Sequence, residues 1–273
     1  MAATFVVVPQ WQGSGSSRAM RLVDGAEAIR GDLPTAATRT VAVPLEAGDA
    51  EGSGVPRLSS IAIVRDRLIA ELALIDGVAI TIGGDCSVEL GAIPRVLDQD
   101  AAVVWFDAHP DLNTPESSTS HAFTGMILRT LLGDGPAALV PAEPLSSERV
   151  VLAGTRSLDP EEEAFVAERG IRMIAADEVS PESVIAAVEA TGAATVYVHI
   201  DLDVLDPADL SGLGAPEPFG VRAAVLVQTL KALLARFPLA GAGITEFAPS
   251  SPDDAVEDLP TILRIIGALN RQS

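Results

Sequence analysis

The sequence predicts an α/β protein with a parallel β-sheet covered by helices. Eight short apolar runs rich in β-branched residues alternate with longer segments of helical periodicity, as in parallel strands joined by helices. Hydrophobic residues make up 48% of the 273 residues, enough for a large core. No low-complexity linker divides the chain, and we expect residues 1–273 to form a single domain. By count alone, eight repeats also fit a closed barrel.

The elements follow from the local pattern in chain order. Strands are expected at Thr4–Val8, Thr40–Pro44, Val78–Ile82, Ala102–Phe106, Val150–Ala153, Arg172–Ile174, Thr195–Ile200 and Ala242–Thr245. Helices are expected at Ser17–Ile29, Arg57–Ile75, Ser87–Leu97, Thr124–Leu132, Pro160–Glu168, Pro181–Thr191, Arg222–Arg236 and Ala255–Asn270. Asp159 and Ser180 each precede a proline and are expected to cap a helix, and Ser87 is expected to do the same.

Charge and cysteine content narrow the range of partners and compartments. The chain has 18 basic and 38 acidic residues, a net charge of -20, so it lacks a basic nucleic-acid footprint and anionic membranes would repel it. Its acidity favours cationic ligands. A single cysteine, Cys86, fits a reducing compartment. We see no signal peptide and no segment with the apolar length of a membrane span, and we expect a cytoplasmic protein.

The stretch Trp105–Thr114 carries the strongest chemical signal. The apolar run Ala101–Phe106 ends in Asp107, His109 and Asp111. In an extended segment these alternating side chains would point into one crevice at the end of the strand. Two carboxylates and an imidazole suit a hard or borderline divalent cation. The alternative is a capped turn with a histidine in a loop.

A second acidic cluster follows the strand that begins at Thr195. Asp201 and Asp203 would share one side of an extended segment, and two such clusters at strand ends predict a two-metal hydrolytic site. A calcium loop fits less well because its Gly and distal Glu are missing. A two-metal phosphoester hydrolase would need a basic phosphate clamp, and Lys and Arg are sparse here. Glu246 ends the last strand, where it would pair with a substrate cation or cap a loop.

Cys86 and His199 adjoin these clusters. Cys86 follows Gly83–Asp85 at an expected helix N-terminus, which would lower the pKa of its thiol, and it would either reach the crevice or fill space in the core. His199 precedes Asp201 by two residues and is interpreted as structural, with support of a metal ligand as the alternative.

Together these motifs resemble the ureohydrolase superfamily of arginase, agmatinase and formimidoylglutamase. The resemblance covers nearly the whole chain and rests on the ordered motifs Gly83–Ser87, Asp107–Asp111, Asp201–Pro207 and Glu246. It implies a three-layer α/β/α arginase-like fold with an eight-stranded, mostly parallel sheet, which selects the open sheet over the barrel. It also implies a binuclear Mn²⁺ centre, hydrolysis of a guanidino or formimino C–N bond, and a homo-oligomer, either a trimer or a hexamer.

The resemblance also assigns roles to individual positions. The implied metal ligands are Cys86, Asp107, His109, Asp111, Asp201 and Asp203, with Asp111 and Asp201 bridging and Asp111 orienting the attacking hydroxide. Glu246 would pair with the guanidinium. The implied contacts to an amino-acid end are Asn113, Ser120, Asp159 and Glu162, which favours an α-amino-acid substrate.

Several positions depart from the family pattern. Cys86 stands where most members have His, and a soft thiolate matches Zn²⁺, Fe²⁺ or Co²⁺ better than Mn²⁺. Thr124 stands where a proton-shuttling His is usual, which leaves His121 as a candidate general acid. Ala122 and Ala215 replace polar groups that contact substrate in arginases. The leading hypothesis is therefore an active ureohydrolase, and the alternative is a catalytically weak or silent arginase-fold protein that binds a metal or small molecule.

Overall fold

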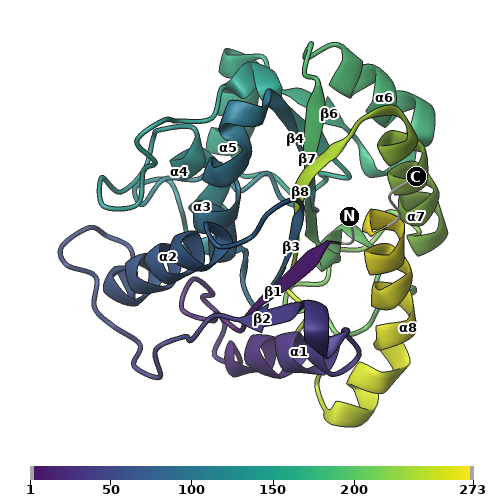
Figure 1. Ribbon diagram of the computed structural model, residues 1–273. Helices are drawn as coiled ribbons and strands as arrows, with labels where there is room; N and C mark the ends of the chain where they lie inside the picture. Colours follow the sequence, from purple (N-terminus) through teal and green to yellow (C-terminus); the bar gives the residue numbers. More distant parts are fainter. Residues whose placement is uncertain (1–2, 271–273) are drawn as a thin grey trace.

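Eight parallel strands form one sheet in the order β2-β1-β3-β8-β7-β4-β5-β6 (Figure 1). The structure, a computed structural model, describes residues 3–270. The strands are β1 (Thr4–Val8), β2 (Thr38–Thr40), β3 (Ala79–Gly83), β4 (Ala101–Phe106), β5 (Val150–Ala153), β6 (Arg172–Ile174), β7 (Thr195–Asp201) and β8 (Leu239–Thr245). Every pairing between neighbouring strands is parallel, so their carboxyl ends share one edge. The predicted open sheet is confirmed, and it is wholly rather than mostly parallel.

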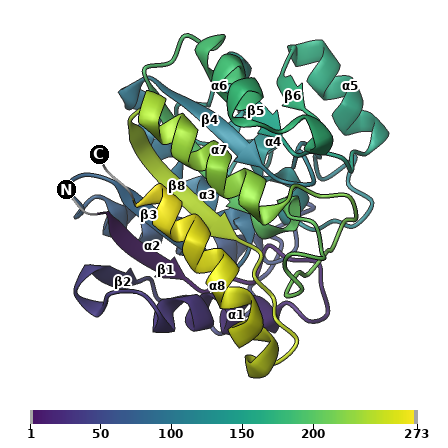
Figure 2. The same cartoon turned by 90° about the vertical axis from the view of Figure 1, so that its right-hand side faces the viewer.

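Helices cover both faces of the sheet. They are α1 (Met20–Gly31), α2 (Leu58–Leu72), α3 (Glu89–Ala92), α4 (Ile127–Leu131), α5 (Pro160–Arg169), α6 (Pro181–Glu189), α7 (Ala223–Arg236) and α8 (Pro252–Leu269). Figures 1 and 2 show α2 to α5 on one side of the sheet and α6 to α8 on the other. The predicted three-layer α/β/α arrangement is therefore present.

Two hydrophobic cores fill the space between the layers. One packs the apolar faces of α1, α6, α7 and α8 against the sheet, with Leu230 and Ile262 among its buried residues. The other packs α2 to α5 against the opposite face, with Leu68 and Ile127 among its members. Strand alternation divides β7 between them, and Tyr197 belongs to the core on the α2–α5 side. The residues in phase with Tyr197 therefore face that layer.

Two elements differ from the sequence prediction. Strand β2 ends at Thr40, where the prediction placed its beginning, because its ladder with β1 pairs Phe5–Val7 with residues 38–40. The single helix predicted at Ser87–Leu97 is broken into a 3₁₀ turn at Cys86–Val88, the short α3, and a second 3₁₀ turn at Pro94–Gln99. Pro94 explains the break, since proline has no N–H to donate and its ring clashes with the preceding turn.

The predicted caps can be checked one by one. Asp159 and Ser180 cap α5 and α6 as expected, each with a proline in the first helical turn. Ser87 was wrongly predicted as a cap, because the Asp85 carboxylate accepts the Ser87 N–H at 2.8 Å and caps that turn instead. The Ser87 hydroxyl is buried and has no hydrogen-bond partner among the residues that the structure describes.

Candidate active site

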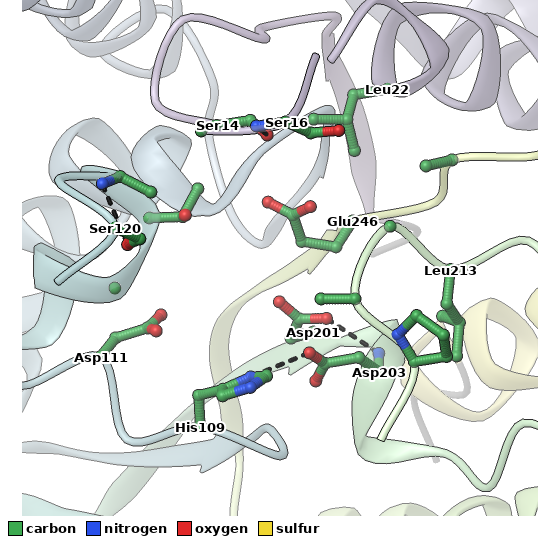
Figure 3. A pocket seen from close by; sticks show the side chains of 18 of the residues that line it. Ser14, Ser16, Leu22, His109, Asp111, Ser120, Asp201, Asp203, Leu213 and Glu246 are labelled. Carbon is green, nitrogen blue, oxygen red and sulfur yellow. Dashed lines mark hydrogen bonds and ion pairs between the residues drawn. The ribbon is translucent and has the colours of Figure 1, made fainter. Parts of the chain in front are cut away.

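A cavity of about 730 Å³ opens at the carboxyl edge of the sheet (Figure 3). Segments after five strands line it: Ser14–Leu22 after β1, His109–Gly125 after β4, Ser157–Glu162 after β5, Asp201–Pro216 after β7 and Glu246–Ser250 after β8. Open α/β sheets bind ligands at this edge. The long loops after β4 and β7 therefore meet at one pocket.

The turn after β4 brings Asp107 and His109 together, although not through an extended segment as predicted. Strand β4 ends at Phe106, and the Asp107 carboxylate accepts the His109 N–H at 2.7 Å, which folds the chain into a tight turn. Asp111 has a left-handed backbone with φ of 53°. The predicted strand alternation is wrong here because carboxylate-to-backbone bonds replace the ladder.

The turn after β7 is held by the same kind of carboxylate-to-backbone hydrogen bond. The Asp201 carboxylate accepts the Asp203 N–H at 2.8 Å, and residues 202–204 form a 3₁₀ turn rather than the predicted extended run. The Asp203 carboxylate in turn accepts the Ala108 N–H at 3.1 Å and lies 3.0 Å from His109 Nδ1. The two acidic turns are therefore locked to each other, as Figure 3 shows for His109 and Asp203.

Three overlapping groups of metal-type donors result, each with its ligand atoms within 4.8 Å of one another. Asp107, His109 and Asp203 form the pocket group; Cys86, Asp201 and Glu246 form the floor group; Cys86, Asp107 and His199 form the buried group. Five of the six predicted ligands appear in them. Asp111 lies in none of the three groups, although its carboxylate lines the same cavity.

Two carboxylate oxygens at this edge have no partner within the described residues. They are Asp111 Oδ2 and Glu246 Oε1. A buried acceptor without a donor costs free energy, so such atoms mark places where a cation or a substrate N–H belongs. Figure 3 shows the Glu246 carboxylate reaching into the cavity between the aspartates and the Ser14–Leu22 segment.

Burial and mutual repulsion shift the pKa values of the carboxylates here. Removal from solvent raises the pKa of Asp111, Asp201 and Glu246 well above the usual range, and neighbouring carboxylates raise it further. Asp107 is the exception, because the nearby imidazoles of His109 and His199 outweigh its burial and hold its pKa below the usual range. Burial lowers the pKa of His109, but bonds to Asp107 and Asp203 prevail and raise it to about 12.

The pKa of the Cys86 thiol shifts in the direction opposite to the prediction. Burial raises the pKa of Cys86 well above its ordinary value, and nearby Asp201 and Glu246 raise it further. The expected lowering by a helix N-terminus is wrong, because Cys86 begins a three-residue 3₁₀ turn surrounded by carboxylates. Its S–H donates to Asp201 Oδ2 at 3.1 Å. The thiol therefore reaches the cluster of donors, as one of the two sequence interpretations expected.

The donor set fits divalent cations. Several carboxylates crowd together with too few positive charges to balance them, and bound cations would relieve both the repulsion and the unpartnered oxygens. Carboxylates and an imidazole are ligands of Mn²⁺, Fe²⁺ and Zn²⁺, and the Cys86 sulfur adds a soft donor.

Three of the four residues predicted for an amino-acid end form one chain of contacts beside the cavity. Asn113 Nδ2 donates to Asp159 at 2.9 Å, and both line the cavity. Glu162 lines it too, but its two oxygens accept the backbone N–H groups of Leu112 and Asp159, each at 2.9 Å. Glu162 thus joins α5 to the loop after β4.

The remaining candidates divide between the inside and the outside of the cavity. Ser120 and Thr124 line it. His121 does not belong to the lining; it is exposed and has a left-handed backbone with φ of 54°. The structure therefore does not bring His121 together with the other predicted catalytic residues.

Sequence reasoning missed three features of the site. Arg156 donates hydrogen bonds to backbone carbonyls of the segments after β5 and β7, including those of Asp203 and Glu217 at 2.8 Å. Arg18 and Arg21 supply positive charge in the lining after β1. Glu89 lies buried against His199. Basic residues in loops carry no spacing signal, and the Glu89 contact depends on how the layers pack.

Comparison with known proteins identifies the family. A model of the arginase family matches residues 26–258. The chain belongs to the arginase family. It is 31% identical to an arginase from Entamoeba histolytica over 190 residues, which are 65% of this chain and 64% of that protein. It is 37% identical to an arginase from Bacillus caldovelox over 149 residues, 50% of each chain. These alignments thus span between half and two thirds of the relatives' length.

Solved structures of arginases share the fold throughout. The crystal structure of Entamoeba histolytica arginase in complex with L-ornithine superposes with a TM-score of 0.87 at 25% identity, covering 98% of this chain and 97% of that one. Formimidoylglutamase from Bacillus subtilis has a TM-score of 0.77 at 18% identity, covering 98% and 87%, and shows the fold alone. The predicted ureohydrolase membership and arginase-like fold are confirmed. Among the described residues, no helix is long and apolar enough to span a bilayer.

Proposed function

We propose that this arginase-family hydrolase uses water to cleave a guanidino or formimino C–N bond of an α-amino acid. The observation that carries the proposal is the Glu246 carboxylate, which lines the cavity with the aspartates and whose Oε1 is buried without a partner among residues 3–270. A planar cation with several N–H donors satisfies such a carboxylate better than water does. The single sheet of eight strands supports the expectation that one domain performs this function.

The three overlapping donor groups together would hold two divalent ions, with Mn²⁺ as the expected metal. Asp107, His109, Asp203 and Asp201 would supply most ligands, and Cys86 a further one. A bound divalent ion supplies a nucleophile near neutral pH by lowering the pKa of water. Asp111, whose Oδ2 has no donor in the described part of the chain, would accept a hydrogen bond from the attacking water and fix its orientation.

Other residues of the chain would position the substrate. Glu246 pairs with the guanidinium or formimino group and holds its carbon beside the aspartates. The Asp159 carboxylate, already oriented by Asn113, offers an acceptor to an α-amino group. Arg18, Arg21 and Ser120 offer donors to an α-carboxylate in the same cavity. The opposite charges of the lining therefore favour a zwitterionic substrate over a simple amine.

The second candidate function is a silent or weakly active binder of a metal or small molecule. The position of His121 favours it, because this histidine lies outside the cavity lining and Thr124 inside it does not titrate near neutrality. Under this alternative the metal centre forms but release of the leaving amine lacks an acid.

Turnover measurements separate the two candidates. We expect the manganese-loaded protein to release urea or formamide from at least one guanidino or formimino amino acid, and EDTA to abolish this release. A panel should include arginine, agmatine and formimino-glutamate. If the protein binds manganese by calorimetry yet releases nothing from the whole panel, the silent binder is the correct function.

Assembly and location are further parts of the proposal. A homo-oligomer, trimer or hexamer, and a cytoplasmic location stay predictions from the family resemblance and the single cysteine. Light scattering after size exclusion measures the first. A monomeric mass at micromolar concentration would contradict it.

A further inference from the structure

The buried group lies behind the pocket rather than in it. Cys86 Sγ, an Asp107 carboxylate oxygen and a His199 ring nitrogen lie within 4.8 Å of one another, and these side chains are at most 1% exposed. Neither Cys86 nor His199 belongs to the cavity lining. The three come from the loop after β3, the end of β4 and the interior of β7.

A buried carboxylate orients the imidazole of His199. Glu89 Oε1 lies 2.8 Å from His199 Nδ1, and Glu89 Oε2 accepts the Tyr197 hydroxyl at 2.6 Å. An ionised carboxylate only accepts, so Nδ1 carries the hydrogen and, in the neutral ring, Nε2 carries the lone pair. Metal-bound histidines in proteins almost always donate their second ring N–H to a carboxylate, a carbonyl or a water in this way.

The distances around His199 Nε2 suit ligands of one ion. Nε2 lies 3.8 Å from Asp107 Oδ2 and 3.9 Å from Cys86 Sγ. An N–H···O hydrogen bond is shorter, at about 2.7–3.2 Å. Two ligands of a tetrahedral ion lie roughly 3.4–3.6 Å apart when the metal–nitrogen, metal–oxygen and metal–sulfur bonds are about 2.0–2.3 Å. His199 Nε2 therefore lies close to the spacing of ligands from each of the other two donors.

The surrounding strands fix this geometry. The Trp105 ring stacks on His199 with centroids 3.6 Å apart. Gly243 on β8 is paired in register with His199, and a Cβ built there would lie 1.8 Å from Glu89 Oε1. The absence of a side chain at Gly243 thus leaves the space that the carboxylate occupies. Both His199 and its orienting partner are held in a single place.

We propose that Cys86, Asp107 and His199 bind one of the two proposed ions, a transition metal, through sulfur, oxygen and nitrogen, with Glu89 as a positioning residue. Asp201 Oδ2, 3.1 Å from Sγ, is placed to complete a tetrahedral set. Binding releases the thiol proton to solvent. Sulfur and imidazole donors favour Zn²⁺, Co²⁺ or Fe²⁺ over Mn²⁺. The inference rests on the proposed metal-dependent function, because Asp107 belongs to both the pocket group and the buried group.

Cobalt titration of the metal-free protein tests this site without turnover. Cys86 is the only cysteine, so any sulfur-to-cobalt charge-transfer band in the near ultraviolet must come from it. We expect this band to saturate at one equivalent and to be absent in Cys86→Ser. Glu89→Gln and His199→Asn should weaken cobalt binding at this site about 10–100-fold. Ser87→Ala, which removes a buried hydroxyl from the same turn, is the matched control and should titrate like the parent.

The outcomes separate a failure of this proposed metal site from a failure of the proposed hydrolase function. Visible cobalt absorption without the ultraviolet band would place the ion among the other carboxylates and overturn this inference, while the metal-dependent hydrolase would stand. Binding of neither cobalt nor manganese by calorimetry would overturn both. Circular dichroism checks that each variant folds. X-ray absorption of the zinc-loaded parent needs no variant: a sulfur shell at about 2.3 Å supports the site, and a shell of only nitrogen and oxygen contradicts it.

Discussion

The carboxylates at the carboxyl edge of the sheet face the cavity on one side and the protein interior on the other. The two sides differ in their hydrogen bonding. On the cavity side, Asp111 and Glu246 each have a carboxylate oxygen without a partner among the described residues, and both side chains line the cavity. On the buried side, Glu89, Tyr197 and His199 satisfy one another away from the cavity. Unpartnered groups on one side and a closed network on the other indicate that the first side exchanges ligands and the second holds a fixed geometry. Each prediction below tests this contrast.

The largest effect is expected on the cavity side. Glu246→Gln should lower kcat/KM by roughly 10²–10³-fold, because the substrate cation then lies in a site without its opposite charge. Steady-state kinetics with the best substrate of the panel measure the loss. Glu257→Gln, the same change on the exposed surface of α8, is the control. Equal activity of both variants would show that Glu246 does not bind the substrate cation.

Metal removal should make stability depend on pH in a defined direction. Asp111, Asp201 and Glu246 have raised pKa values in the folded protein, so the folded state binds more protons than the unfolded one above about pH 4. Their stabilising contribution is complete below that pH and is lost as pH rises through the folded values. The unfolding midpoint of the metal-free protein should therefore fall from pH 5 to pH 8.

Metal should reverse this trend, since protons compete with the ion for the same oxygens. Thermal unfolding across this pH range, with EDTA and with excess manganese, measures both curves. A metal-free midpoint that rises with pH would contradict the crowding of carboxylates described above.

A smaller effect is expected where the cavity meets α5. Glu162→Gln removes one of two carboxylate oxygens that accept the Leu112 and Asp159 N–H groups. We expect a loss of about 1 kcal/mol in the free energy of unfolding, from a weakened capping box. Urea titration measures it. Glu161→Gln, in the same first turn but exposed, should change stability by much less.

The smallest effect is expected at His121. His121→Ala should change kcat less than twofold at any pH between 6 and 9, because this side chain is exposed and outside the cavity lining. A pH–rate profile of the variant checks this. A loss of the acidic or basic limb would show that His121 moves into the cavity and serves as the general acid.

The sequence predicted the chemistry of the site better than its geometry. Alternating apolar runs placed seven of the eight strands closely, and the acidic motifs identified residues that gather at the carboxyl edge of the sheet. The prediction of extended ligand segments was wrong because Asp107 and Asp201 bond to backbone N–H groups two residues later. Such turns compete with strand pairing whenever Asp follows a strand end.

Other residues could be understood only in three dimensions. His199 meets Glu89 across the space beside Gly243, a contact set by the register of β7 and β8 and by the packing of α3. Arg156 has no periodic neighbour that would single it out. A single sequence contains no signal for contacts between elements so distant along the chain.

Arg156 has one more consequence, for how the pocket admits its ligand. Its guanidinium binds five carbonyls, those of residues 154, 203, 204, 217 and 218, and so ties the loops after β5 and β7 into a rigid rim. Across the cavity, the hydrogen bonds of residues 114–122 within the described chain stay inside the segment 113–122. Arg156 thus holds one side of the entrance rigid, and the passage of ligands depends on the opposite side, residues 114–122.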